Sequence, residues 1–175
     1  MVTVSAQTSL SGSLEDTWTA LGRRACYLCF PGISPAPPSE GERQGALAHD
    51  LDLPFIGRER QMALLSVGRS GPGSGRAERR FAMRGPLVSI AGRWQLQPAA
   101  AGVVHLGLTL DYEISGPLKE RAVNELRSRS PLPIRTDADA ILGRAVDDFF
   151  EIRFAEDAAA YCERVRARLD GPRPS

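Results

Sequence analysis

The sequence predicts an α+β fold in which a helix covers one face of an antiparallel β-sheet. Residues 103–114 and residues 88–97 each alternate between apolar and polar side chains, as half-buried strands do, and residues 98–102 supply a turn between them. Near the C-terminus, apolar residues recur every three or four positions, which is the spacing of an amphipathic helix. A hairpin with one apolar face needs an apolar cover, and we expect this helix to provide it.

The central hairpin defines the two faces of the predicted sheet. Its inward side chains are apolar or aromatic: Val88, Ile90, Trp94, Leu96, Val104, Leu106, Leu108, Leu110, Tyr112 and Ile114. The side chains between them are mostly polar and include Arg93, Gln95, Gln97, His105, Asp111 and Glu113. Because successive side chains of a strand point to opposite faces, we expect this second group to face solvent.

A further strand and a short helix are predicted at the N-terminus. Residues 2–10 alternate between apolar and polar side chains and predict the first strand. Ser13, followed by Asp16 three residues later, resembles the capping pair of a short helix. In that helix, we expect Trp18 and Leu21 to face the core.

The next segment predicts a helix, a loop and a strand. Residues 23–30 predict a second short helix, which Pro31-Gly32 would end. Residues 33–42 contain the run Ser-Pro-Ala-Pro-Pro-Ser and have no periodicity, so we expect a surface loop able to flex over a cavity mouth. Residues 47–55 alternate again and predict a strand with His49 on its inward face.

A second hairpin leads into the central one. Residues 57–60 predict a turn, residues 62–69 a strand, and residues 70–75 a flexible hairpin loop. The strand that follows would carry three inward side chains: Arg79, Phe81 and Met83.

The last third of the chain predicts two helices. Gly116-Pro117 would end the last strand and start a short helix that carries Leu118, Ala122 and Leu126. Residues 128–135 contain two prolines and predict an irregular link, after which Thr136 would open the final helix. The apolar stripe of that helix contains Ile141, Leu142, Ala145, Val146, Phe149 and Phe150, and it continues through Tyr161, Val165 and Leu169.

These patterns resemble those of the START-like (SRPBCC) superfamily of polyketide cyclases, aromatases and lipid-transport proteins. A Gly-Pro pair precedes Gly92-x-Trp94-x-Leu96-x-Pro98 and a strand that ends in Leu110-x-Tyr112, similar to the later strands of that family. The strand at residues 2–5, the helix at residues 13–21 with its tryptophan, and Phe30-Pro31-Gly32 are similar to the family's N-terminal elements.

The resemblance implies a helix-grip fold with a ligand cavity. In this fold a curved antiparallel sheet, here of six or seven strands, wraps around a long C-terminal helix, with two short helices after the first strand. We expect one START-like domain over residues 1–171 and a disordered tail at residues 172–175. The short helix at residues 117–127 looks like an insertion relative to the family pattern.

Length, composition and charge narrow the class of protein. With 175 residues and 42% hydrophobic side chains, the chain is long enough for one domain with a full core. A net charge of +1 does not favour binding to nucleic acid or to an anionic membrane. From the sequence we expect neither a membrane span nor a signal peptide, and its three cysteines do not predict a disulfide framework. We therefore expect a cytoplasmic protein, as a monomer or homodimer.

Three polar side chains on inward faces are candidates for catalysis. His49 would act as a proton donor or acceptor, or would be a core histidine bonded to a backbone carbonyl. Arg79 would hold an enolate or carboxylate, or would be solvated at the rim of the sheet. Tyr112 would donate to a substrate carbonyl, or would satisfy a neighbouring group.

The predicted cavity has a soft apolar lining suited to a flat or long hydrophobic ligand. Its predicted lining residues are Trp18, Met62, Phe81, Met83, Trp94, Leu108, Leu110, Val146 and Phe149. The alternative is a filled core without a cavity. Cys26 and Cys29 form a CxxC motif without a second pair at metal-binding spacing, so two small buried residues explain them better than zinc with His49 or Cys162.

The sequence thus leads to three hypotheses for function. The first is a cofactor-free, metal-free cyclase or dehydratase of the polyketide type, which pre-organises a hydrophobic, carbonyl-rich intermediate in a bacterial biosynthetic pathway. His49 would be its acid or base, with Arg79 and Tyr112 polarising carbonyls. The second is a non-catalytic binder or carrier of a lipid, a quinone or an aromatic polyketide. The third is an interaction subunit whose cavity is closed.

Overall fold

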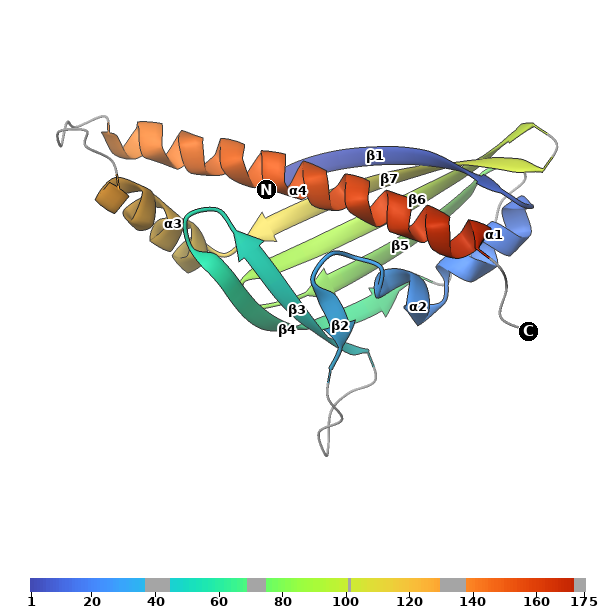
Figure 1. The fold of residues 1–175 in the computed structure, drawn as a ribbon, viewed down its shortest axis with the longest axis horizontal. Coiled ribbons are helices and arrows are strands. Elements are labelled where there is room, and N and C mark those ends of the chain that lie inside the picture. Colours follow the sequence, from blue (N-terminus) through green and yellow to red (C-terminus); the bar gives the residue numbers. More distant parts are fainter. Residues whose placement is uncertain (37–44, 69–74, 101, 130–137, 172–175) are drawn as a thin grey trace.

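A seven-stranded antiparallel sheet with a long helix along one face forms the structure (Figure 1), a computed structural model that describes residues 1–36, 45–68, 75–100, 102–129 and 138–171. The strands are β1 (Val2–Ser11), β2 (Ile33–Pro35), β3 (Ala46–Leu53), β4 (Gly57–Val67), β5 (Ala77–Arg84), β6 (Val88–Ala100) and β7 (Val103–Ile114). The helices are α1 (Leu14–Leu21), α2 (Arg24–Tyr27), α3 (Gly116–Arg129) and α4 (Ala138–Asp170).

The strand order is β1-β7-β6-β5-β4-β3-β2, with every neighbouring pair antiparallel. Strands β3 to β7 follow one another along the chain, and β1 joins the sheet beside β7. The 33-residue helix α4 lies along the inner face close to β1, and α3 packs at its N-terminal end (Figure 1). This is the helix-grip arrangement, and it confirms the predicted fold class.

The central hairpin of β6 and β7 has one buried apolar face and one polar face, as its alternating sequence predicts. Trp94, Leu106, Leu108 and Leu110 are at most 1% exposed and form the core under α4. The opposite face carries polar pairs, such as the Ser9 hydroxyl 2.8 Å from Nδ1 of His105.

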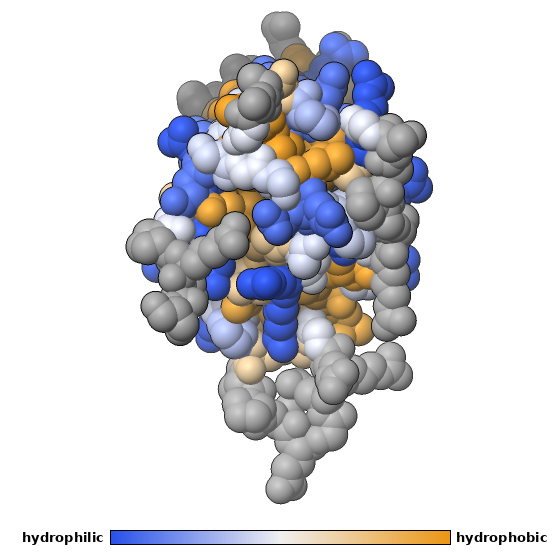
Figure 2. Space-filling model, turned by 90° about the vertical axis from the view of Figure 1, so that its right-hand side faces the viewer, coloured by the Kyte–Doolittle hydropathy of each residue, from blue (hydrophilic) through white to orange (hydrophobic). Residues whose placement is uncertain are grey.

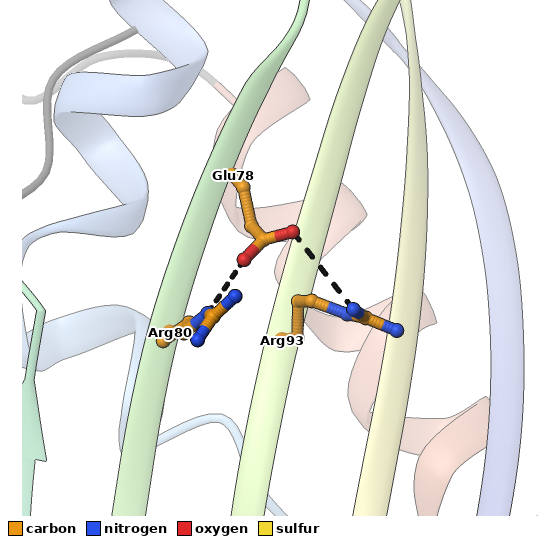
Figure 3. A network of polar contacts seen from close by, with 3 residues as sticks. All are labelled: Glu78, Arg80 and Arg93. Atoms are coloured by element: carbon orange, nitrogen blue, oxygen red, sulfur yellow. Dashed lines mark hydrogen bonds and ion pairs between the residues drawn. The ribbon is translucent and has the colours of Figure 1, made fainter.

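Figure 3 shows three more side chains of this outer face, in which the Glu78 carboxylate on β5 lies between two arginines. The Arg80 Nε is 2.6 Å from one Glu78 oxygen, and Arg93 Nη1 on β6 is 3.9 Å from the other. These ion pairs are solvated, so they contribute little stability but hold polar groups on the outer side of the sheet.

At the end of the molecule that lies on the right in Figure 1, the visible described surface is mixed. Hydrophobic side chains show there as patches between hydrophilic ones (Figure 2). Among the described residues, none of the helices combines the length and apolar character needed to span a membrane.

The helical stripe of α4 differs from the predicted one at two positions. The buried side chains follow a spacing of three or four: Leu142, Val146, Phe150, Phe154, Ala158, Tyr161, Cys162 and Val165. Ile141 and Phe149, predicted in the stripe, are 59% and 46% exposed. Each precedes a buried residue by one position, which turns it about 100° away from the sheet.

Several predicted boundaries are wrong. Residues 57–60 are the start of β4, because the turn lies at residues 54–56, where Phe55 has a positive φ of 68°. Residues 33–35 form β2 instead of a loop, paired with β3. The strand β6 continues to Ala100 through a bulge after Pro98.

The other boundary differences are smaller. The second helix covers only Arg24–Tyr27, and α3 continues to Arg129. The N-cap of α1 is as predicted, since the Ser13 hydroxyl accepts a hydrogen bond from the backbone N–H of Asp16 at 3.0 Å. The predictions for residues 37–42, 70–74, 130–136 and 172–175 lie outside the described residues.

Gly92 allows the Phe81 ring to lie on the sheet, and this contact yields a test of the core. A Cβ at Gly92 would come within 2.0 Å of the Phe81 ring. We predict that Gly92→Ala lowers the free energy of unfolding by about 1–3 kcal/mol, because the ring must leave its packed position.

The measurement is urea unfolding followed by circular dichroism, with Gly107→Ala on the neighbouring strand as the matched control. A Cβ at Gly107 would meet only Gln95 atoms at 3.9 Å, so this variant should match or exceed wild-type stability. Equal stability of the two variants would contradict the packing of Phe81 described here.

Candidate functional site

A pocket of about 530 Å³ opens between α4 and the strands β3 and β4. Residues of the two strands line one side of it and residues of α4 line another. Leu51, Leu53 and Phe154 give it an apolar part, whereas Arg58, Arg60 and Arg164 are among its charged residues. His49 and Asp157 also line it, from β3 and α4 respectively. The pocket therefore combines an apolar surface with groups able to donate hydrogen bonds or carry protons.

The buried side chain of Gln61 determines how His49 is presented to this pocket. The Gln61 Oε1 accepts hydrogen bonds from the backbone N–H groups of Leu87 and Val88, at 2.9 and 3.1 Å. Its Nε2 donates to the Val88 carbonyl at 2.8 Å. Because two backbone donors face the oxygen and a carbonyl faces the nitrogen, the orientation of the amide is fixed.

The remaining hydrogen of the Gln61 amide fixes the tautomer of His49. Gln61 Nε2 lies 3.3 Å from His49 Nδ1, and an amide nitrogen can only donate, so Nδ1 is the acceptor. A neutral imidazole with an accepting Nδ1 carries its proton on Nε2. Burial lowers the pKa of His49 to about 4, against a smaller opposite effect of Asp50, so the ring is neutral at pH 7.

The geometry of His49 therefore suits hydrogen-bond donation better than proton abstraction. None of the described residues accepts a hydrogen bond from its Nε2, and the residue lines the pocket. A ligand oxygen in the pocket would complete the hydrogen bonding of the ring.

Asp157 is the second titratable group at the pocket that is largely buried. Its side chain is 16% exposed, and its Oδ1 lies 3.2 Å from Nη2 of Arg153 one turn earlier on α4. Burial raises the pKa of Asp157 to about 6; Arg153 and Arg164 oppose the rise, and Glu156 and Asp52 add to it. The carboxyl group can thus take up or release a proton near neutral pH.

Tyr112 lies behind the pocket wall. Its ring stacks on Phe154 with 3.9 Å between centroids and 2° between planes, and Phe154 is the residue that reaches the pocket. The buried Tyr112 hydroxyl has no hydrogen-bond partner among the described residues. Burial raises the pKa of this hydroxyl well above its usual range, so it is a neutral donor.

Arg79 does not line this pocket. Its guanidinium carbon lies 3.7 Å from the centroid of the Trp18 ring, and its Nη1 donates to the Gly68 carbonyl at 3.1 Å. The buried side chain covers the half-buried Trp18, a cation–π contact that stabilises this part of the core. Of the three predicted catalytic residues, only His49 reaches the pocket directly.

The nine predicted ligand-binding residues divide into three groups, one of which is Trp18 alone, beneath Arg79 and outside the pocket. Six are buried in the core and do not line the pocket: Phe81, Met83, Trp94, Leu108, Leu110 and Val146. Aromatic rings fill the space around them, since Tyr161 lies 5.3 Å from Trp94 and 6.3 Å from Phe81 between ring centroids. Whether they contact a ligand stays a prediction.

The inward orientation predicted for Met62 and Phe149 is wrong. Met62 is 44% exposed, because the register of β4 against β3 turns its neighbours Gln61 and Ala63 to the core. Phe149 is 46% exposed and packs edge-on against Phe55, 4.8 Å away.

Two residues of the site were missed by sequence reasoning. Gln61 alternates with Ala63 and Leu65 along β4, so this spacing could have predicted that its side chain faces the core. Asp157 lies three residues after Phe154 and four before Tyr161, so it is an acidic residue beside the buried stripe of α4.

Of the two cysteines in the CxxC motif, Cys26 is buried and Cys29 is half-buried. Cys26, Cys29 and Cys162 are free thiols, and burial raises the pKa of Cys26 to about 11. Within the described ranges, no three His, Cys, Asp or Glu side chains come together in a way that could hold a metal ion.

Comparison with known proteins yields similar structures but no similar sequences. No protein family and no curated protein matches the sequence. A START superfamily protein from Mycobacterium smegmatis is 13% identical, with 96% of this chain and 97% of that chain covered and a TM-score of 0.47. The Zhui aromatase/cyclase from Streptomyces sp. R1128 is 16% identical, with coverages of 95% and 94% and a TM-score of 0.48.

A lipid transfer and protein localization domain, that of human StarD13, is 9% identical, with coverages of 94% and 75% and a TM-score of 0.48. At this level of similarity no activity is transferred from these proteins. The chain has the helix-grip fold on the evidence of its own strand order and its C-terminal helix.

The hydrogen bonds of Gln61 lead to a test of the site. We predict that Gln61→Leu lowers the free energy of unfolding by about 2–4 kcal/mol, because it leaves buried backbone groups of residues 87 and 88 without partners. Urea unfolding measures the effect, and Gln95→Leu on the exposed face of β6 is the control. If the two variants are equally stable, the described role of Gln61 is incorrect.

Proposed function

We propose that this protein binds a small, hydrophobic, carbonyl-bearing molecule in the pocket between α4 and the strands β3 and β4, and promotes proton transfer on it as a cyclase or dehydratase does. The observation that carries the proposal is the neutral His49 in the pocket wall, with its Nδ1 engaged by Gln61 and its Nε2–H free of described partners. Leu51, Leu53 and Phe154 supply apolar contact area beside it.

A donor of this kind suits a carbonyl oxygen. A hydrogen bond to the oxygen draws electron density from the carbonyl and makes the adjacent C–H groups more acidic. Gln61 holds the imidazole in place, so little reorganisation accompanies the reaction. A neutral donor also avoids the cost of burying a cation, which the low pKa of His49 reflects.

Tyr112 and Arg79, the two residues predicted to polarise carbonyl groups, differ in whether they could reach a ligand in this pocket. The Tyr112 hydroxyl lies one ring behind the wall and would reach a ligand if the Phe154 side chain rotated away. Arg79 is engaged with Trp18 and Gly68, so we assign it a structural role.

The first test of the proposal compares 2-tetralone with tetralin, which has the same carbon skeleton but no carbonyl group. We predict that the wild-type protein binds 2-tetralone about tenfold more tightly, since one hydrogen bond contributes about 1 kcal/mol or slightly more. His49→Leu should bind the two compounds equally. Isothermal titration calorimetry or ligand-observed NMR measures the affinities, with thermal melting as a check of folding.

The control variant is His105→Leu, which removes the other histidine from the exposed outer face. It should keep the wild-type preference for 2-tetralone. If neither compound binds, the pocket proposal fails, and an interaction subunit with a closed interior becomes the better hypothesis. If both bind equally to the wild type, His49 is not the donor. Binding without any catalysed proton transfer would favour a carrier.

A further inference from the structure

We propose that Asp157 is the base that removes a proton from the carbon next to the carbonyl of the bound molecule, acting across the pocket from the His49 donor. The inference rests on the proposed function, because it needs a carbonyl compound in this pocket. It adds a catalytic residue on α4 and narrows the substrate class to hydrophobic ketones with at least one hydrogen on the adjacent carbon.

The placement of Asp157 supports this role. Asp157 and His49 line the same pocket from different elements, so a ligand that fills it can meet both. Arg153 holds Oδ1 of Asp157 at 3.2 Å, and the same guanidinium lies 3.3 Å from Glu156 through its other terminal nitrogen. None of the described residues donates a hydrogen bond to Oδ2 of Asp157, so this oxygen is available to a ligand.

The electrostatic surroundings make Asp157 a stronger base than an ordinary aspartate. A carboxylate that is 16% exposed is poorly solvated, which favours uptake of a proton. Arg153, Glu156 and Arg164 on α4 and Asp52 on β3 act on its charge. The same pocket is also lined by charged residues of the two strands, namely Asp50 on β3 and Arg58, Glu59 and Arg60 on β4. Four of these groups are cationic and four are anionic, so their charges largely offset one another. Burial is the largest influence and raises the pKa of Asp157 to about 6.

The proposed step conserves atoms and charge. The Asp157 carboxylate takes the proton, and the electron pair of the broken C–H bond forms the carbon–carbon double bond of the enolate. The carbonyl electron pair moves to oxygen, which accepts a hydrogen bond from His49 Nε2–H. Reprotonation of the carbon by Asp157, after its proton has exchanged with water, regenerates the ketone and needs no co-reactant.

Hydrogen–deuterium exchange of 2-tetralone in D₂O isolates this step. Loss of the C1 hydrogen signals is followed by proton NMR, with the rate in buffer alone subtracted. We predict that the wild-type protein accelerates exchange and that the rate rises with pH to a plateau, with a midpoint near 6, where Asp157 loses its proton. Asp157→Asn should lower the catalysed rate by about 100-fold or more. His49→Leu should lower the rate and keep the midpoint.

The matched control is Asp148→Asn, which makes the same change of charge on an exposed position of α4 outside the pocket. It should leave both the rate and the midpoint unchanged. If Asp157→Asn fails to fold, Asp157→Glu provides the test: a shifted midpoint supports the inference, and an unchanged rate and midpoint overturn it.

The outcomes separate this inference from the proposed function. If 2-tetralone binds but the wild type does not accelerate exchange, Asp157 is not a catalytic base, while the binding pocket stands. If Asp157→Asn binds 2-tetralone and exchanges it at the wild-type rate, another group is the base. If 2-tetralone does not bind, the proposed function and this inference both fail.

Discussion

The buried amide of Gln61 is the interaction on which the rest of the site depends. Among the described residues, the pairing of β4 with β5 begins at Leu64, opposite Arg84, so the part of β4 before Leu64 diverges from β5. The Gln61 side chain spans the gap and binds the backbone of residues 87 and 88. Its last hydrogen goes to His49. The Gln61 side chain therefore has two effects. It bridges the strands where the curved sheet separates them, and it fixes which nitrogen of His49 carries the proton.

The position of α4 explains why the pocket lies where it does. The helix packs mainly against β1, at the edge of the sheet, and the aromatic rings around Tyr161 fill the space beneath it. On the opposite side, β3 and β4 approach α4 without closing on it, and the pocket remains. The residues that line this pocket are more polar than the apolar lining that the sequence predicted. This is why we propose the pocket beside His49 and Asp157, and not the deep core, as the site of the reaction.

The sequence predicted the parts of the structure that depend on local periodicity. The central hairpin, the N-cap at Ser13 and the C-terminal helix follow from patterns within a few residues. Hydropathy favours methionine over glutamine and so predicts an inward Met62, yet Gln61 is buried because partners 26 and 27 residues away satisfy its amide. Such partners are invisible in a linear pattern. The same holds for Asp157, whose burial depends on strands far away in the chain.

The claim that His49 is a neutral donor with its proton on Nε2 can be measured directly. Long-range ¹⁵N–¹H NMR of the imidazole nitrogens distinguishes the two tautomers and the cation, and the His105→Leu variant leaves His49 as the single histidine. At pH 6 the account predicts a protonated Nε2, an unprotonated Nδ1 and a neutral ring. A proton on Nδ1, or a cationic ring at this pH, would contradict it.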